Sequence, residues 1–111
     1  MIGDLKMANL TLWSATKDVT SIISSMVSTF HTLRTIRKED SIRLKNKIKA
    51  LENVAKAEGL GEVARANIRE ITRTQELIDK SNLKGESLGF AMNQLEILNH
   101  MLEKNVKEFL K

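Results

Sequence analysis

The chain has 111 residues, of which 41% are hydrophobic and 29% are charged, and its formal net charge is +4. This size and composition are typical of one small folded domain. The chain contains no cysteine, which excludes disulfides, thiolate metal sites and a cysteine nucleophile. No apolar run reaches the roughly 18 positions that suggest a membrane-spanning helix.

The N-terminal segment 1–10 does not resemble a secretory signal, because Asp4 and Lys6 interrupt its apolar residues. We therefore expect a cytoplasmic protein, with signal-less export as the alternative.

The first predicted helix covers about residues 5–39. Its apolar residues recur every seven positions, and a second set follows three positions after the first. This spacing places both sets on one face of an amphipathic helix. In the middle and the second half of the segment, these positions hold Leu12, Ala15, Val19, Ile22, Met26, Leu33 and Ile36.

The apolar face is interrupted at Arg37, Asp40 and Ser41 and then resumes in the same phase over about 41–58. One interpretation ends the first helix near residue 39 and lets Asp40 or Ser41 cap a second helix. The other continues a single helix to residue 58. The unchanged phase slightly favours a continuous or gently kinked helix.

The stretch Gly59-Leu60-Gly61 is the clearest break, because glycine readily adopts the left-handed conformation that ends a helix. Two further amphipathic helices are predicted over about 62–80 and 86–110. Their core positions are Ala64, Ile68, Ile71, Gln75 and Ile78, followed by Leu88, Leu95, Leu102 and Phe109.

The predicted fold is all-α within a single domain, 1–111. Short connections make neighbouring helices antiparallel, so the architecture is a helical hairpin or a four-helix bundle. A two-helix hairpin has a thin core, and self-association would complete it.

This layout is similar to that of the small secreted hairpins of type VII secretion, in which a Trp-x-Gly turn joins two helices. The corresponding turn here is Gly59-Leu60-Gly61, so the tryptophan is missing. The resemblance implies a secreted helical hairpin as one alternative, but the motif does not match and no family is assigned.

The outer side of the first helix is a candidate contact surface, because no charged residue occurs from Val19 to Leu33. Small uncharged side chains allow another helix or another chain to approach closely. Tryptophan, which is enriched in interface hot spots, lies on the same side. The candidate residues are Trp13, Ser21, Ser24, Ser25, Ser28 and His31.

A second candidate surface is on the last helix, where Phe90, Ile97 and Met101 form a narrow stripe. This stripe lies roughly 130° around the helix from the main apolar face. A helix that is apolar on two sides is either central in a bundle or buries one side against a partner.

The positive charge is concentrated in residues 34–49, whose net charge is +5. The basic residues there are Arg34, Arg37, Lys38, Arg43, Lys45, Lys47 and Lys49. Such a segment can bind nucleic acid or an anionic membrane, or it can form a solvated corner of the bundle. No aromatic residue lies between positions 31 and 89 to stack on bases, which makes nucleic acid less favoured.

The sequence contains no recognisable catalytic, metal-binding or phosphate-binding motif. The two histidines, His31 and His100, have no recognisable catalytic or metal-binding setting, and no phosphate-binding glycine loop is present. We predict no catalytic residue, metal, cofactor or small-molecule substrate. The predicted function is a non-enzymatic protein-interaction module, such as an inhibitor, immunity factor, adaptor or assembly subunit. Its partner is another protein or, as a homo-oligomer, the chain itself, and nucleic-acid or membrane binding is the alternative.

Overall fold

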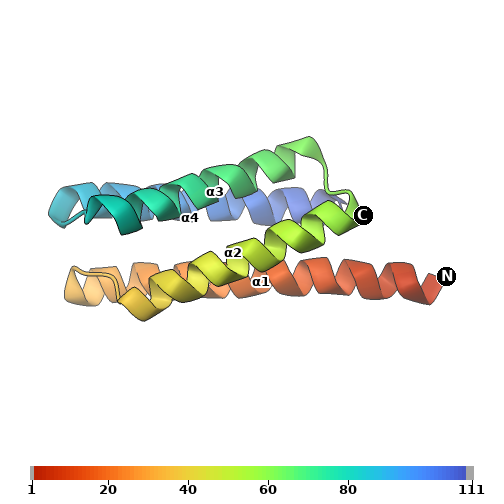
Figure 1. The fold of residues 1–111 in the computed structure, drawn as a ribbon, viewed down its shortest axis with the longest axis horizontal. Helices are drawn as coiled ribbons and strands as arrows, with labels where there is room; N and C mark the ends of the chain where they lie inside the picture. The colour runs from red at the N-terminus through yellow and green to blue at the C-terminus, as the bar shows by residue number, and fades with distance from the viewer. Residues whose placement is uncertain (1, 110–111) are drawn as a thin grey trace.

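Four helices form the regular structure of the part of the chain that the structure describes. The computed structural model describes residues 2–109, with side chains from residue 11 onward. The helices are α1 (Ile2–Leu33), α2 (Lys38–Glu58), α3 (Glu62–Ser81) and α4 (Gly85–Phe109). Successive helices run in opposite directions, so the start of α1 and the end of α4 lie at the same end of the molecule (Figure 1). The all-α prediction is confirmed, in its four-helix form.

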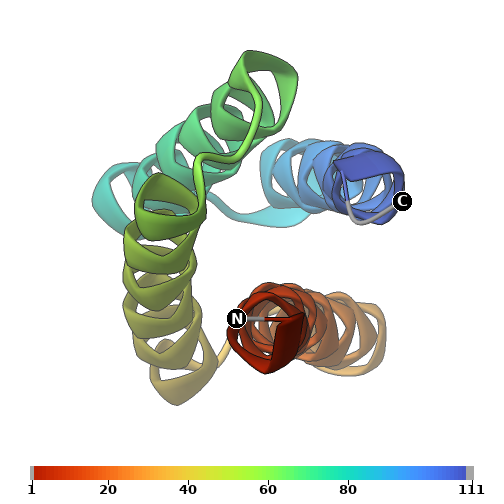
Figure 2. The same cartoon turned by 90° about the vertical axis from the view of Figure 1, so that its right-hand side faces the viewer.

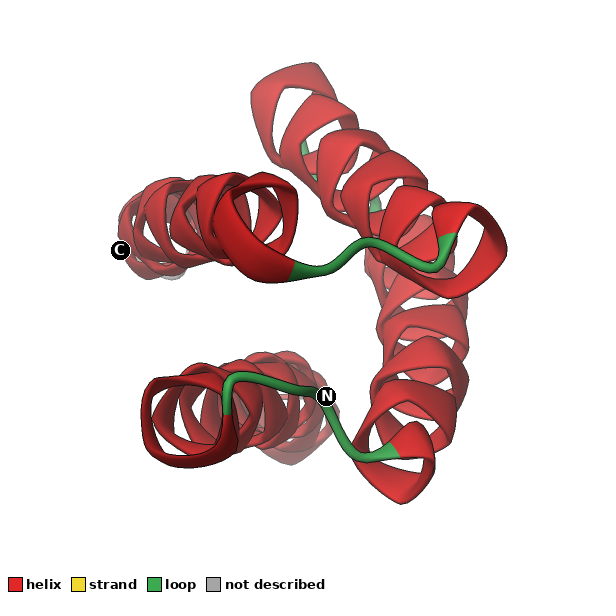
Figure 3. Ribbon diagram, turned by 90° about the vertical axis from the view of Figure 1, so that its left-hand side faces the viewer, coloured by secondary structure: helices red, strands yellow, loops and turns green. Residues whose placement is uncertain are grey.

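The helices pack as a closed ring in which each one contacts two others. α1 contacts α2 and α4, and α3 contacts the same two helices. The end-on view shows this arrangement, with α1 and α4 side by side (Figure 2). The opposite end carries the α1–α2 and α3–α4 loops (Figure 3). The bundle measures 50 × 22 × 20 Å, so its core is long and narrow.

The core receives side chains from every helix and runs the length of the ring. Leu12 and Met26 of α1, Leu44 and Leu51 of α2, Ile71 of α3 and Met92, Leu95 and Leu102 of α4 are almost completely buried. Leu33 and Phe109, which the heptad spacing assigns to the core, are exposed instead. Each is the last residue of its helix, where the ring offers fewer neighbours.

The preferred prediction of one helix across residues 34–44 is wrong. α1 ends where Arg34 takes a left-handed conformation (φ 58°) and its N–H donates to the Phe30 carbonyl at 2.7 Å. The N-cap of α2 is the extended residue Arg37, so neither Asp40 nor Ser41 caps that helix. The loop 34–37 is four residues long, which is close to one helical turn. The loop therefore preserves the phase of the apolar stripe, and the sequence pattern alone does not reveal the end of α1.

The turn between α2 and α3 depends on Gly59. This residue is left-handed (φ 67°, ψ 38°), and its N–H donates to the Ala55 carbonyl. The N–H of Leu60 donates to the same carbonyl at 2.9 Å, and its side chain is buried. Gly61 then serves as the N-cap of α3 with φ −59°. Of the two glycines, only Gly59 has a backbone conformation that other residues adopt with difficulty.

Gly59→Ala should therefore destabilise the fold by about 1 kcal/mol. An added Cβ meets no atom within 4 Å, so the cost comes from the backbone alone. Gly61→Ser is the matched control, because φ −59° suits any residue and serine is a good N-cap. Urea denaturation should show a loss for the first variant and no loss for the second. Equal stabilities would contradict the left-handed turn.

Candidate protein-interaction surface

α4 is apolar on two sides, and only one of them faces the core. Leu88, Leu95 and Leu102 on the inner side are buried. On the outer side, Phe90 is 78% exposed, and Ile97 and Met101 are each 47% exposed. Spacings of seven and four residues place these three side chains in one line along the helix. We call Phe90, Ile97 and Met101 the α4 outer stripe.

The ring leaves the α4 outer stripe uncovered. α4 contacts only α1 and α3 among the helices, so it is not the central helix of a bundle. Of the two explanations that the sequence allows for a doubly apolar helix, the central position is therefore excluded. Burial of this side against a partner stays a prediction.

A hollow adjoins Phe90 between α3 and α4. Its volume is about 430 Å³, and its apolar walls are Leu77, Leu83, Phe90 and Ala91. Leu77 of α3 is 50% exposed, so it widens the apolar surface beyond α4. Leu77 was not predicted from the sequence, because it is an isolated apolar residue on the outer side of α3. Only the packing of α3 against α4 brings it next to Phe90.

The rim of this hollow is polar. Thr74 of α3 and Glu86, Ser87 and Gln94 of α4 complete its lining. An apolar centre that holds an aromatic side chain, surrounded by mostly uncharged polar groups, is the usual composition of a protein-interaction surface.

The predicted serine surface of α1 points outward. Ser21, Ser24, Ser25 and Ser28 are all exposed, as is His31. No helix in the described part of the chain covers these side chains. Trp13, the remaining residue of this predicted surface, contacts Lys107 of α4. Contact of the exposed serines with another chain stays a prediction.

A polar groove of about 450 Å³ separates the serine surface from α4. Ser24, Ser28 and His31 line one side, and Glu96 and His100 lie among the residues of the other. The two histidines, distant in sequence, are thus brought to one groove. Across residues 11–109, no group of three or more His, Asp or Glu side chains is placed to hold a metal ion.

Trp13 is half-buried and already has contacts within the chain. Its ring packs against the core. The ammonium groups of Lys17 and Lys107 each lie 5.7 Å from the ring centroid, within the range of a cation–π interaction. Because Lys107 belongs to the last turns of α4, Trp13 helps to hold the end of that helix against α1.

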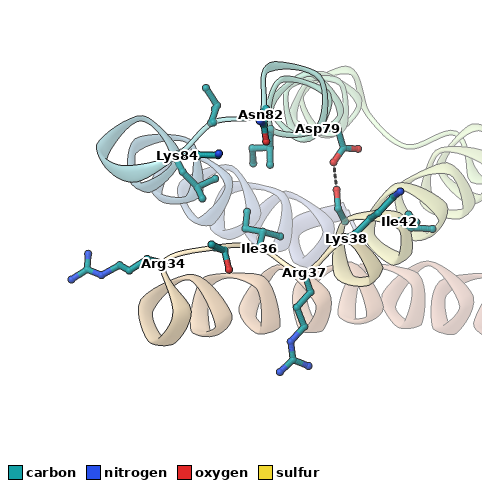
Figure 4. Close-up of a pocket in the computed structure, with 13 residues that line it drawn as sticks. Arg34, Ile36, Arg37, Lys38, Ile42, Asp79, Asn82 and Lys84 are labelled. Carbon is teal, nitrogen blue, oxygen red and sulfur yellow. Dashed lines mark hydrogen bonds between the residues drawn. The ribbon is translucent and has the colours of Figure 1, made fainter.

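The predicted anion-binding residues do not form a single band. Arg34 and Arg37 lie in the α1–α2 loop, and their side chains point away from the cavity that they border (Figure 4). The continuous helix that would align Arg34 with Lys38, Lys45 and Lys49 does not exist.

The remaining basic residues are divided between two settings. Arg43 lies 3.7 Å from Asp40, and Lys47 lies 3.4 Å from Asp18 of α1. Lys38, Lys45 and Lys49 are exposed on α2. Some of the seven basic residues thus form ion pairs and others are exposed lysines, as expected for a solvated corner of a bundle.

The cavity bordered by Arg34 and Arg37 has a volume of about 520 Å³, and two of its lining residues, Ser41 and Asp79, belong to a polar network. Ser41 of α2 donates a hydrogen bond to Asp79 of α3, marked in Figure 4, and Gln75 donates to the other oxygen of that carboxylate. Ser41 and Gln75 are buried at core positions, where these hydrogen bonds satisfy their polar groups. The network joins α2 to α3.

Ion pairs along α3 are exposed. Arg69 donates a hydrogen bond to Glu62 at 3.0 Å, and Arg65 lies 3.5 Å from the same carboxylate. The hydrogen bond from Arg69 and the charges of both arginines lower the pKa of Glu62. Exposed pairs of this kind contribute little to stability.

Comparison of the chain with protein-family models, with curated proteins and with solved structures finds no match. Over the described residues, no helix combines the length and the apolar character needed to cross a bilayer.

Asp79→Ala should destabilise the fold by about 1–3 kcal/mol, because Ser41 and the buried amide of Gln75 would lose their shared acceptor. Glu76→Ala, an exposed carboxylate on the same helix, is the control and should change stability by less than about 0.5 kcal/mol. Thermal and urea denaturation measure both. Equal effects would mean that the network does not stabilise the α2–α3 contact.

Proposed function

We propose that this chain is a non-enzymatic, helical protein-interaction module whose contact surface is the α4 outer stripe together with Leu77. The observation that carries the proposal is the exposure of Phe90 and its neighbours on a helix whose other side already fills the core. Burying one such side chain contributes about 1.5–3 kcal/mol, so covering the stripe gives a partner a substantial driving force.

The chemistry of the surface favours a protein as the partner. Aromatic and methionine side chains are enriched in the centres of protein interfaces, and charged residues are depleted there. The stripe has Phe90 and Met101 near its ends, Ile97 between them and the uncharged Asn93 and Gln94 beside them. Inhibitors, immunity factors, adaptors and small assembly subunits all act through surfaces of this kind.

A photo-crosslinking amino acid at Gln94 should form a covalent adduct in the cells that produce the protein. Gln94 is exposed and lines the hollow beside Phe90, so a bound partner lies within reach of it. Asn53, an exposed amide on the outer side of α2, is the matched control position. Gel analysis and mass spectrometry should detect the adduct from position 94 only.

Adding Ile97→Glu to the Gln94 crosslinking variant should suppress the adduct without loss of helix content by circular dichroism. A charged carboxylate within the stripe must be desolvated when a partner binds, whereas the free protein keeps the introduced carboxylate in water. The absence of any adduct, or equal yields from positions 94 and 53, would contradict the proposed function.

A further inference from the structure

We infer that the partner of the α4 outer stripe is a second copy of this chain, whose own α4 packs antiparallel to the first across a two-fold axis near residue 95. The inference rests on the proposed function and names the partner. It follows from the opposite charges at the two ends of the stripe, Glu86 and Lys104, which are both exposed.

The positions of these two charges are matched by helix geometry. Glu86 and Lys104 are 18 residues apart in α4, which is five turns at 3.6 residues per turn. They therefore project from the same side of the helix, about 27 Å apart along its axis. The whole α4 outer stripe lies between them.

A two-fold axis at the level of residue 95 places each of these charges opposite its counterpart. In an antiparallel pair, residues at equal distances on either side of the axis face each other, and residues on one flank of a helix meet the same flank of its partner. Glu86 of each copy then faces Lys104 of the other, so the dimer has two symmetric ion pairs. The register follows from the charges alone.

The same register brings one apolar pair together. Phe90 comes within one residue of Met101 of the second copy, and Ile97 faces Asn93 of the second copy. The hollow of about 430 Å³ beside Phe90 and Leu77, whose rim includes Glu86, lies on the α3 side of α4. It offers room for the flexible side chain of Met101 from the second copy.

Self-complementarity is the reason to prefer a second copy over a foreign protein. A two-fold interface requires one surface to contain both halves of every contact, and this surface does so for Glu86 with Lys104 and for Phe90 with Met101. Parallel pairing of the same helices would place Glu86 against Glu86 and Lys104 against Lys104. Such like-charge contacts are unfavourable, so the antiparallel arrangement is selected.

The test is sedimentation equilibrium of the full chain at low ionic strength, from micromolar to millimolar concentration. Glu86→Lys or Lys104→Glu alone introduces two like-charge contacts into each dimer and should weaken dimerisation about tenfold. The double variant restores both ion pairs with reversed polarity and should recover affinity to within about threefold of the original chain. Glu96→Lys, on the side of α4 that borders the polar groove, should have little effect.

Fold stability is measured in parallel, because Glu86 lies in the first turn of α4 and its reversal opposes the helix dipole. Circular dichroism melting curves identify a temperature at which every variant is folded, and dimerisation is compared there. Phe90→Ser, which keeps all charges, should weaken dimerisation at least tenfold.

Two outcomes would overturn the inference. A dimer whose charge reversals are not rescued by the double variant excludes this register. A chain that stays monomeric throughout the concentration range excludes self-pairing. In that case, a crosslinked adduct of foreign mass at Gln94 would leave the proposed function intact, whereas the absence of any adduct would remove both proposals.

Discussion

Burial of one apolar stripe from each helix is the constraint on which this structure depends. Four helices in a closed ring satisfy it, because each helix faces two neighbours and contributes its stripe to a shared core. The chain reverses at loop 34–37, so α1 and α2 pack against each other and both contribute to the core. Only one side of each helix faces this core, so a helix with a second apolar side leaves that side outside it. The second apolar side of α4 is therefore exposed by the same packing that stabilises the rest.

The polar groups of the core follow from this packing as well. Ser41, Gln75 and Asp79 replace apolar contacts at the loop end of the bundle with hydrogen bonds between α2 and α3. At the opposite end, the ring of Trp13 lies near the ammonium group of Lys107 and so connects α1 to α4. Hydrogen bonds thus join α2 to α3 at the loop end, and a cation–π contact joins α1 to α4 at the opposite end. Neither contact uses the α4 outer stripe.

Helical periodicity predicted much of this fold. The core positions of α3, such as Ile68 and Ile71, could be read from their spacing, as could the turn at Gly59, because helix geometry and glycine conformation are local properties. The break after Leu33 could not be read, because a four-residue loop is close to one helical turn. The sequence also could not predict which residues of different helices lie close together, such as Leu77 and Phe90. Their proximity depends on which helices are neighbours, which spacing along one helix does not specify.

The measurement that tests the account most directly is a dilution series followed by NMR of labelled isoleucine and methionine methyl groups. If the ring buries one apolar stripe of each helix and a second copy covers the α4 outer stripe, the signals of Ile97 and Met101 should shift as concentration rises. Those of the buried Met26 and Ile71 should stay constant. Constant signals from Ile97 and Met101, or equal shifts from the buried methyl groups, would contradict the account.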